Sequence, residues 1–174
     1  MAQTVALFMD LPNLYQSICR KEARMDARQV LSEIREKFGK PVISNAYAFF
    51  RRIPEPVQAH LMNLNVALIQ CPAYQGGLPT TDSVMAAEIY EVLYSRRVDT
   101  FVIGSGDGDF APLACAIRAR GRRAVALAEK NSLSRRLRDA VDEVIFWPAA
   151  TASSAPVSRP AACPAPRAGK AVPV

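Results

Sequence analysis

Residues 100–110, TFVIGSGDGDF, decide the fold of this chain. An apolar run of strand length leads directly into small residues that carry Asp107 and Asp109, and a helical pattern begins at once. In an α/β sheet, this is where a strand delivers groups to a ligand crevice. Two interpretations of the turn stay open. The paired carboxylates bind a hard cation, or Asp109 is the N-cap of the following helix.

Strands and helices alternate on both sides of this segment. Apolar runs without polar alternation, typical of strands buried on both faces, occupy residues 5–9, 42–50, 66–69, 124–128 and 144–147. Helical patterns cover residues 26–38, 83–96, 110–120 and 132–138, and another follows Pro54. This alternation predicts an α/β fold with a mainly parallel central sheet and helices on both faces.

The composition changes after Trp147. Residues 148–174 contain six prolines and nine alanines, and their only charges are three basic side chains. Such a segment cannot bury enough apolar area to offset its ordering entropy. We therefore expect one domain over residues 1–147 and a disordered, weakly basic tail over residues 148–174. The net charge of +6 is compatible with a polyanionic partner but does not identify one.

Hydropathy and cysteine spacing indicate a soluble cytoplasmic protein without a membrane partner. No stretch approaches the ~18 apolar residues that span a bilayer. Residues 1–9 lack the basic start of a signal peptide. The four cysteines are widely spaced and form no C-x-x-C pair, which argues against a zinc site and a disulfide framework.

Four aspartates follow strands or begin helices. Asp10 ends the first apolar run, Asp107 and Asp109 follow the run at residues 100–103, and Asp82 begins a helical pattern. Because ligands bind beyond the carboxyl ends of parallel strands, we expect these acids to converge. Crowded carboxylates need a compensating charge, and a divalent cation such as Mg²⁺ supplies it. A metal held in this way points to phosphoryl chemistry.

Each of these residues also has a structural interpretation. Asp10 could be a turn residue, Asp82 an N-cap, and Asn13 a cap of the first helix that also supports Asp10. Ser105 could be only a small turn residue. The sequence contains neither a G-x-x-x-x-G-K-[ST] loop nor a G-x-S-x-G elbow, so it disfavours an NTPase and an α/β-hydrolase.

The basic residues divide into two groups. Arg51 and Arg52 follow the run at residues 42–50, so they are candidate substrate-binding residues for phosphate, or else a solvated turn. Two arginine clusters of the second half are expected to be surface residues or, alternatively, an extension of an RNA-binding track, the more so for the second cluster if it lies near the acids: Arg118, Arg120, Arg122 and Arg123, and Arg135, Arg136 and Arg138. The single histidine, His60, is also expected at the surface.

Three segments carry a family resemblance. Residues 5–14, VALFMDLPNL, contain a D-x-x-N-L motif; residues 101–113, FVIGSGDGDFAPL, contain S-G-D-x-D-F-x-P-L; and residues 133–143, LSRRLRDAVDE, contain L-S-x-x-L-R-x-A-x-D-E. In this order and at these intervals, they resemble the NYN domain family of PIN-like nucleases, most closely its bacterial LabA-like branch. Asp82 falls where that family has a further acid. The resemblance covers about residues 5–147.

The resemblance implies a PIN-like three-layer α/β/α sandwich and a metal-dependent ribonuclease that uses Mg²⁺ or Mn²⁺. Asp10, Asp82, Asp107 and Asp109 match the metal-binding, catalytic acids of the family. Asn13 and Ser105 match its supporting polar positions. The expected partner is RNA in single-stranded form, and a homo-oligomer or a protein partner is a further expectation.

The chain departs from the family pattern at two places. Leu11-Pro12 follows the first acid, where relatives usually have glycine, and Pro79-Thr80-Thr81 precedes Asp82, where relatives usually have a lysine. These departures motivate an alternative function: a PIN-like module with weak or no turnover that acts by binding RNA or protein. A third hypothesis is a metal-dependent phosphohydrolase for small phosphate esters.

Overall fold

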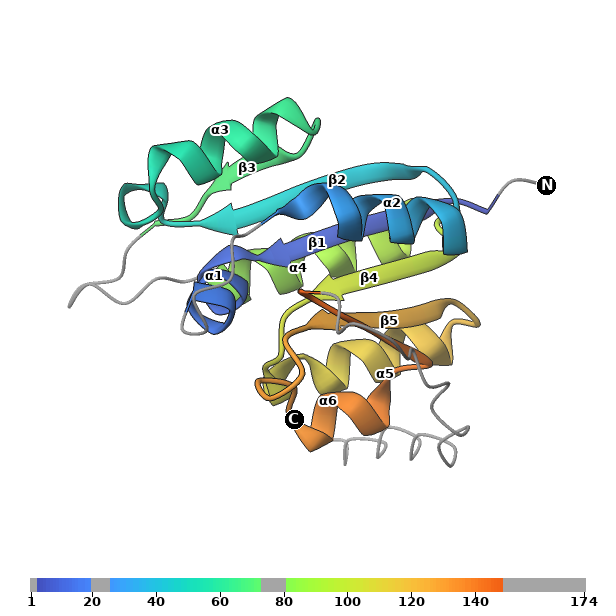
Figure 1. Ribbon diagram of the computed structural model, residues 1–174. Coiled ribbons are helices and arrows are strands. Elements are labelled where there is room, and N and C mark those ends of the chain that lie inside the picture. The colour runs from blue at the N-terminus through green and yellow to red at the C-terminus, as the bar shows by residue number, and fades with distance from the viewer. Residues whose placement is uncertain (1–2, 20–25, 73–80, 149–174) are drawn as a thin grey trace, which may run out of the picture.

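A twisted parallel sheet forms the centre of the molecule (Figure 1). The computed structural model describes residues 3–19, 26–72 and 81–148. Within these ranges the strands are β1 (Val5–Asp10), β2 (Pro41–Ala48), β3 (Ala67–Gln70), β4 (Thr100–Gly104), β5 (Arg123–Ala128) and β6 (Glu143–Phe146). Their spatial order is β3-β2-β1-β4-β5-β6, and every pairing is parallel. The α/β class and the parallel sheet are confirmed.

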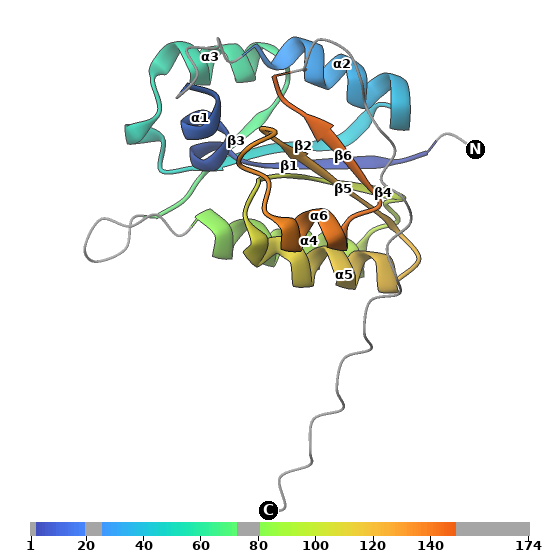
Figure 2. The same ribbon diagram turned by 60° about the horizontal axis from the view of Figure 1, so that its bottom comes forward.

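Helices cover both faces of the sheet, which gives the three layers expected of an α/β/α sandwich (Figure 2). One face carries α1 (Leu11–Cys19), α2 (Ala27–Phe38) and α3 (Glu55–Asn63). The other carries α4 (Thr81–Ser95), α5 (Ala111–Ala119) and α6 (Arg135–Ala140). The sheet separates two hydrophobic cores, one under each helical layer.

The central strand β1 shows why the sheet is buried on both sides. All six of its residues are buried. Leu7 packs into the core under α1–α3, and its neighbour Phe8 faces the other core. There Phe8 stacks with Phe101 of β4 and with Tyr47 of β2. Side chains that alternate between two apolar layers explain the unbroken apolar run in the sequence.

Several elements begin or end at residues other than those expected. The strand expected to reach residue 50 ends at Ala48, and a 3₁₀ turn, η1 (Phe50–Arg52), follows it. The helix expected from residue 110 begins at Ala111, after the 3₁₀ turn η2 (Gly108–Phe110). Helix α6 begins at Arg135 because the hydroxyl of Ser134 caps it by accepting a hydrogen bond from the Leu137 N–H. Residues 149–174 of the expected tail lie outside the described residues.

The strand order reverses between β1 and β4. From β1 the chain builds outward through β2 and β3 on one side, and then through β4, β5 and β6 on the other. In open α/β sheets, such a switch point leaves a crevice beyond the carboxyl ends of the two strands. None of the described helices is both long enough and apolar enough to span a membrane.

Candidate acid site at the switch point

Asp10 is the last residue of β1 and is only 4% exposed. Its Oδ2 accepts a hydrogen bond of 3.2 Å from the Ser105 hydroxyl, which follows β4. Its Oδ1 accepts one of 3.3 Å from the backbone N–H of Asn13, inside the first turn of α1. One buried carboxylate thus joins the ends of β1 and β4 to the start of α1, and it also acts as the cap of that helix.

Ser105 and Asn13 connect Asp10 to the turn that carries the other two acids. The Ser105 Oγ accepts a hydrogen bond of 3.2 Å from the N–H of Asp107. The side-chain oxygen of Asn13 accepts one of 3.0 Å from the N–H of Gly106. Both side chains therefore link the start of α1 and the end of β1 to the turn after β4. Asn13 lies inside α1, so its interpretation as the cap of that helix is wrong.

Asp107, not Asp109, is the cap within the acid turn. Its Oδ1 accepts a hydrogen bond of 3.0 Å from the N–H of Asp109 at the start of η2. The interpretation of Asp109 as an N-cap is wrong, because the backbone of Gly108 and Asp109 first forms a 3₁₀ turn. The Asp109 carboxylate instead projects into solvent, with its side chain 83% exposed.

Asp82 lies inside the first turn of α4 and interacts with the other acids. Partial burial and the negative charge of Asp107 raise its pKa, Asp109 acts in the same direction, and a hydrogen bond with Asp10 opposes the shift. Burial, followed by the charge of Asp82, raises the pKa of Asp10 from 3.8 to about 7, against the hydrogen bonds from Asn13 and Ser105. The four expected acids therefore belong to one electrostatic cluster.

The carboxylate oxygens of the acid cluster are ligands of the kind that a hard divalent cation prefers. The cluster offers carboxylate oxygens, and either a bound cation or protonation would relieve their mutual repulsion. Among the described residues, no group of three or more histidine, cysteine or acidic side chains converges closely enough to hold one ion.

Glycines let the segment before α6 pack directly against the acid turn. The N–H of Ser134 donates a hydrogen bond of 2.8 Å to the Gly106 carbonyl. A Cβ atom at Gly106 would lie 2.5 Å from the Ser132 carbonyl oxygen, and one at Gly108 would lie 3.0 Å from the Ser134 hydroxyl. Packing therefore requires glycine at position 106, where the contact is with backbone, and favours it at position 108.

Two charged residues outside the predicted site lie on segments that border it. Glu129 follows β5 directly and is 6% exposed, and its Oε2 accepts a hydrogen bond of 2.8 Å from the Asn131 N–H. The strand-end rule that selected Asp10 applies equally to Glu129. Arg136, expected to be an ordinary surface residue, places its Nη1 3.8 Å from the Asp109 Oδ1.

The other basic residues lie as follows. Arg51 and Arg52 are exposed on η1, just past β2, at the same edge of the sheet as Asp10. Arg118, Arg122 and Arg123 form ion pairs with Asp142, Asp99 and Glu143, so they serve the fold. His60 is only partly exposed and accepts a hydrogen bond from the Ala27 N–H, which ties α3 to the start of α2.

Comparisons with known proteins support the family resemblance. The family model described as NYN domain matches residues 4–151. An uncharacterized protein of Methanocaldococcus jannaschii is 28% identical over 144 residues, which are 81% of this chain and 54% of that protein. This chain thus spans about half the length of that relative.

A solved structure shares the fold. The crystal structure of a protein of unknown function from Vibrio parahaemolyticus superposes with a TM-score of 0.68 at 21% sequence identity. The match covers 84% of this chain and 93% of that one. At this identity the likeness concerns the arrangement of strands and helices alone.

Proposed function

Because the chain belongs to the NYN domain family, we propose that it is a metal-dependent ribonuclease that hydrolyses RNA phosphodiester bonds at the switch point. The family has a PIN-like nuclease fold, and its nuclease domains act on RNA and generally depend on a divalent metal. The observation that carries the proposal is the acid cluster, in which the buried Asp10 of β1 is joined through Ser105 to the turn after β4.

The proposed roles follow from the positions of the acids. Asp10, Asp82, Asp107 and Asp109 hold Mg²⁺ or Mn²⁺, directly or through water. A bound ion lowers the pKa of a water and stabilises charge on the phosphodiester. The Ser105 hydroxyl positions both acids: it donates a hydrogen bond to the Asp10 carboxylate and accepts one from the Asp107 N–H.

The substrate side of the proposal uses the exposed cations. Arg51 and Arg52 stand on the sheet edge that also presents Asp10, and guanidinium groups bind phosphate bidentately. Single-stranded RNA is the proposed form of the substrate. The motif over residues 101–113 favours the LabA-like branch, and a buried thiol at Cys71 fits a reducing cytoplasm.

The test compares matched aspartate variants on labelled single-stranded RNA with Mn²⁺. We expect the wild-type chain to cleave, and we expect chelator or Asp107→Asn to abolish cleavage. Asp26→Asn is the control, because asparagine caps α2 as well as aspartate does and position 26 lies outside the cluster. Cleavage that survives both chelator and Asp107→Asn belongs to a contaminant and refutes the proposal.

A second candidate is a binding module with weak or no turnover. It is motivated by Leu11-Pro12 after the first acid and by the lack of a basic residue in Pro79-Thr80-Thr81. Calorimetric titration with Mg²⁺ and an RNA-binding assay separate the candidates. RNA binding without cleavage, together with no heat of metal binding at millimolar Mg²⁺, selects the binding module.

A further inference from the structure

The first residues of α6 hold a fixed position relative to the acid turn. The Ser134 N–H donates to the Gly106 carbonyl, and the Ser134 hydroxyl caps α6. A Cβ added at Gly108 would lie in ordinary van der Waals contact with the Arg136 Cβ, at 3.5 Å. The backbone that carries Arg136 is thus held against the backbone that carries Asp109.

Arg136 is the basic residue that this packing brings to the acids. Its Nη1 lies 3.8 Å from the Asp109 Oδ1, and both side chains remain largely in solvent, 71% and 83% exposed. The preceding Arg135 instead pairs along the helix with Asp139, at 3.7 Å. The two adjacent arginines therefore have different surroundings, and of the two only Arg136 lies at the candidate site.

An exposed ion pair of this kind is easily exchanged. The attraction between two solvated charges is weak and screened by salt. Arg136 also has a competitor for Asp109, because a divalent cation bound in the cluster would attract the same carboxylate. When the Asp109 carboxylate binds the cation instead, the N–H donors of the planar Arg136 guanidinium become available at the rim of the site. Phosphate is an anion that a guanidinium binds bidentately.

We propose that Arg136 is a substrate-binding residue that contacts an RNA phosphate beside the acid cluster, and that it exchanges Asp109 for this phosphate when a divalent cation binds. The inference rests on the proposed function for the identity of the ligand. It assigns Arg136 two opposite effects: the guanidinium strengthens RNA binding, and it weakens metal binding by holding a carboxylate of the cluster.

The experiment measures both affinities in the full chain. Binding of a fluorescent single-stranded RNA is followed by anisotropy with Ca²⁺ present, over a range of salt concentrations, and Mn²⁺ binding is followed by calorimetry without RNA. For Arg136→Gln, we expect RNA affinity to fall roughly five- to tenfold and the salt slope to fall by about 0.7, the value for one phosphate contact on a single strand. We expect Mn²⁺ affinity to rise about two- to fivefold, because a neighbouring positive charge is removed.

Two further variants separate this role from a structural one. Arg135→Gln removes the same charge one residue away and should change both affinities less than about twofold. Arg136→Lys should keep the salt slope and recover part of the RNA affinity, since lysine keeps the charge without the bidentate geometry.

The result that overturns the inference is an RNA affinity and salt slope unchanged in Arg136→Gln, or a fall in both RNA and Mn²⁺ affinity with a lower melting temperature. The two proposals fail separately. A wild-type chain that binds RNA without cleaving it refutes the ribonuclease, while the Arg136 comparison still decides the inference. A wild-type chain that cleaves RNA, with Arg136→Gln binding as tightly, refutes only the inference.

Discussion

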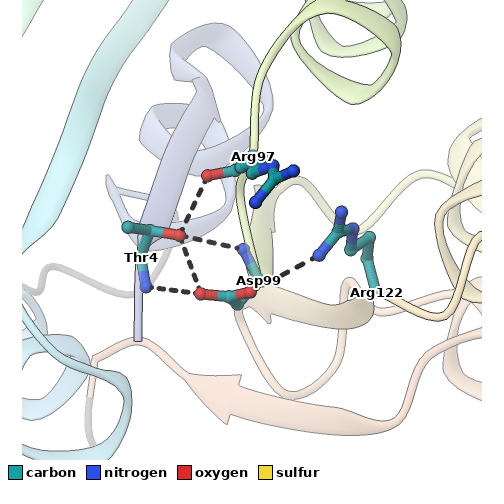
Figure 3. Close-up of polar contacts among 4 residues, drawn as sticks. All are labelled: Thr4, Arg97, Asp99 and Arg122. Carbon is teal, nitrogen blue, oxygen red and sulfur yellow. Dashed lines mark hydrogen bonds and ion pairs between the residues drawn. The ribbon is translucent and has the colours of Figure 1, made fainter. Parts of the chain in front are cut away.

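The aspartates at the two ends of the strand pair β1 and β4 have opposite surroundings, and their pKa values shift in opposite directions. At the amino end, Asp99 precedes β4 and is surrounded by donors (Figure 3). The N–H and hydroxyl of Thr4 donate to its Oδ2 at 2.9 and 2.8 Å, and Arg122 lies 3.4 Å from its Oδ1. The hydrogen bonds from Thr4, with the charge of Arg122 adding to them, lower the pKa of Asp99.

At the carboxyl end, Asp10 is buried beside other acids. Burial and the charge of Asp82 raise its pKa to about 7, although Asn13 and Ser105 donate to it. The same two strands therefore end in a satisfied carboxylate on one side and a destabilised one on the other. Such a destabilised group persists at functional sites because function, and not stability, requires it. This contrast supports the carboxyl end of β1 and β4 as the place of the proposed site.

The largest expected effect comes from Asp10→Asn. Cleavage of RNA should fall more than about 100-fold, the scale of losing a group placed directly in a catalytic site. The same variant should be more stable than wild type in chelator at pH 8, by about 1–4 kcal/mol, because a neutral amide removes the buried charge. Urea unfolding and the RNA assay measure the two effects. An Asp10→Asn protein that is both fully active and less stable would contradict the assignment.

The second prediction concerns the pH range of that stability difference. Between its ordinary pKa of 3.8 and its folded pKa of about 7, Asp10 binds more protons in the folded state than in the unfolded state. The stability contributed by position 10 therefore falls as pH rises through this window and is constant above it. The advantage of Asp10→Asn over wild type should be absent near pH 3 and complete by pH 8. Saturating Mg²⁺ should reduce it, whereas a pH-independent difference would mean that Asp10 has an ordinary pKa.

The third prediction tests the packing of α6 on the acid turn. In Gly106→Ala, the new methyl group would meet the backbone oxygen of Ser132 at 2.5 Å, so the turn or α6 must move. We expect a loss of about 1–3 kcal/mol in unfolding free energy together with lower RNA cleavage. Gly108→Ala is the milder comparison, because its nearest contact is a side-chain atom, the Ser134 hydroxyl at 3.0 Å, and not backbone. Equal losses in both variants would mean that the close backbone approach is not limiting.

Much of this site could be predicted from sequence because strand ends are local features. The apolar runs located β1 and β4, and the rule for carboxyl ends then selected Asp10 and the Asp107-Gly108-Asp109 turn. The structure joins these through Ser105. Glu129 lies outside the predicted set, although the same rule applies to it because it directly follows β5.

Other features depend on tertiary packing and left no local signal. The cap of the acid turn is Asp107 and not Asp109, because a 3₁₀ turn precedes α5. The charge next to Asp109 comes from Arg136, which reaches it only because Gly106 and Gly108 admit the segment before α6. From sequence alone, Arg136 was indistinguishable from Arg135.

The smallest expected effect is at the amino end of the strand pair. Asp99→Ala removes the acceptor for Thr4 and the partner of Arg122, so unfolding should begin at slightly lower urea concentration at pH 7, while RNA cleavage stays unchanged. The sign of the pH dependence is opposite to that of Asp10. Because the folded pKa of Asp99 is lowered, its stabilisation is present above the ordinary pKa of 3.8 and is lost as pH falls through the folded value. Wild type and Asp99→Ala should therefore converge in acid, where wild type and Asp10→Asn also converge. An Asp99→Ala variant that lost cleavage without losing stability would show that the two ends of β1 and β4 are coupled, and the separation between a structural and a functional end would fail.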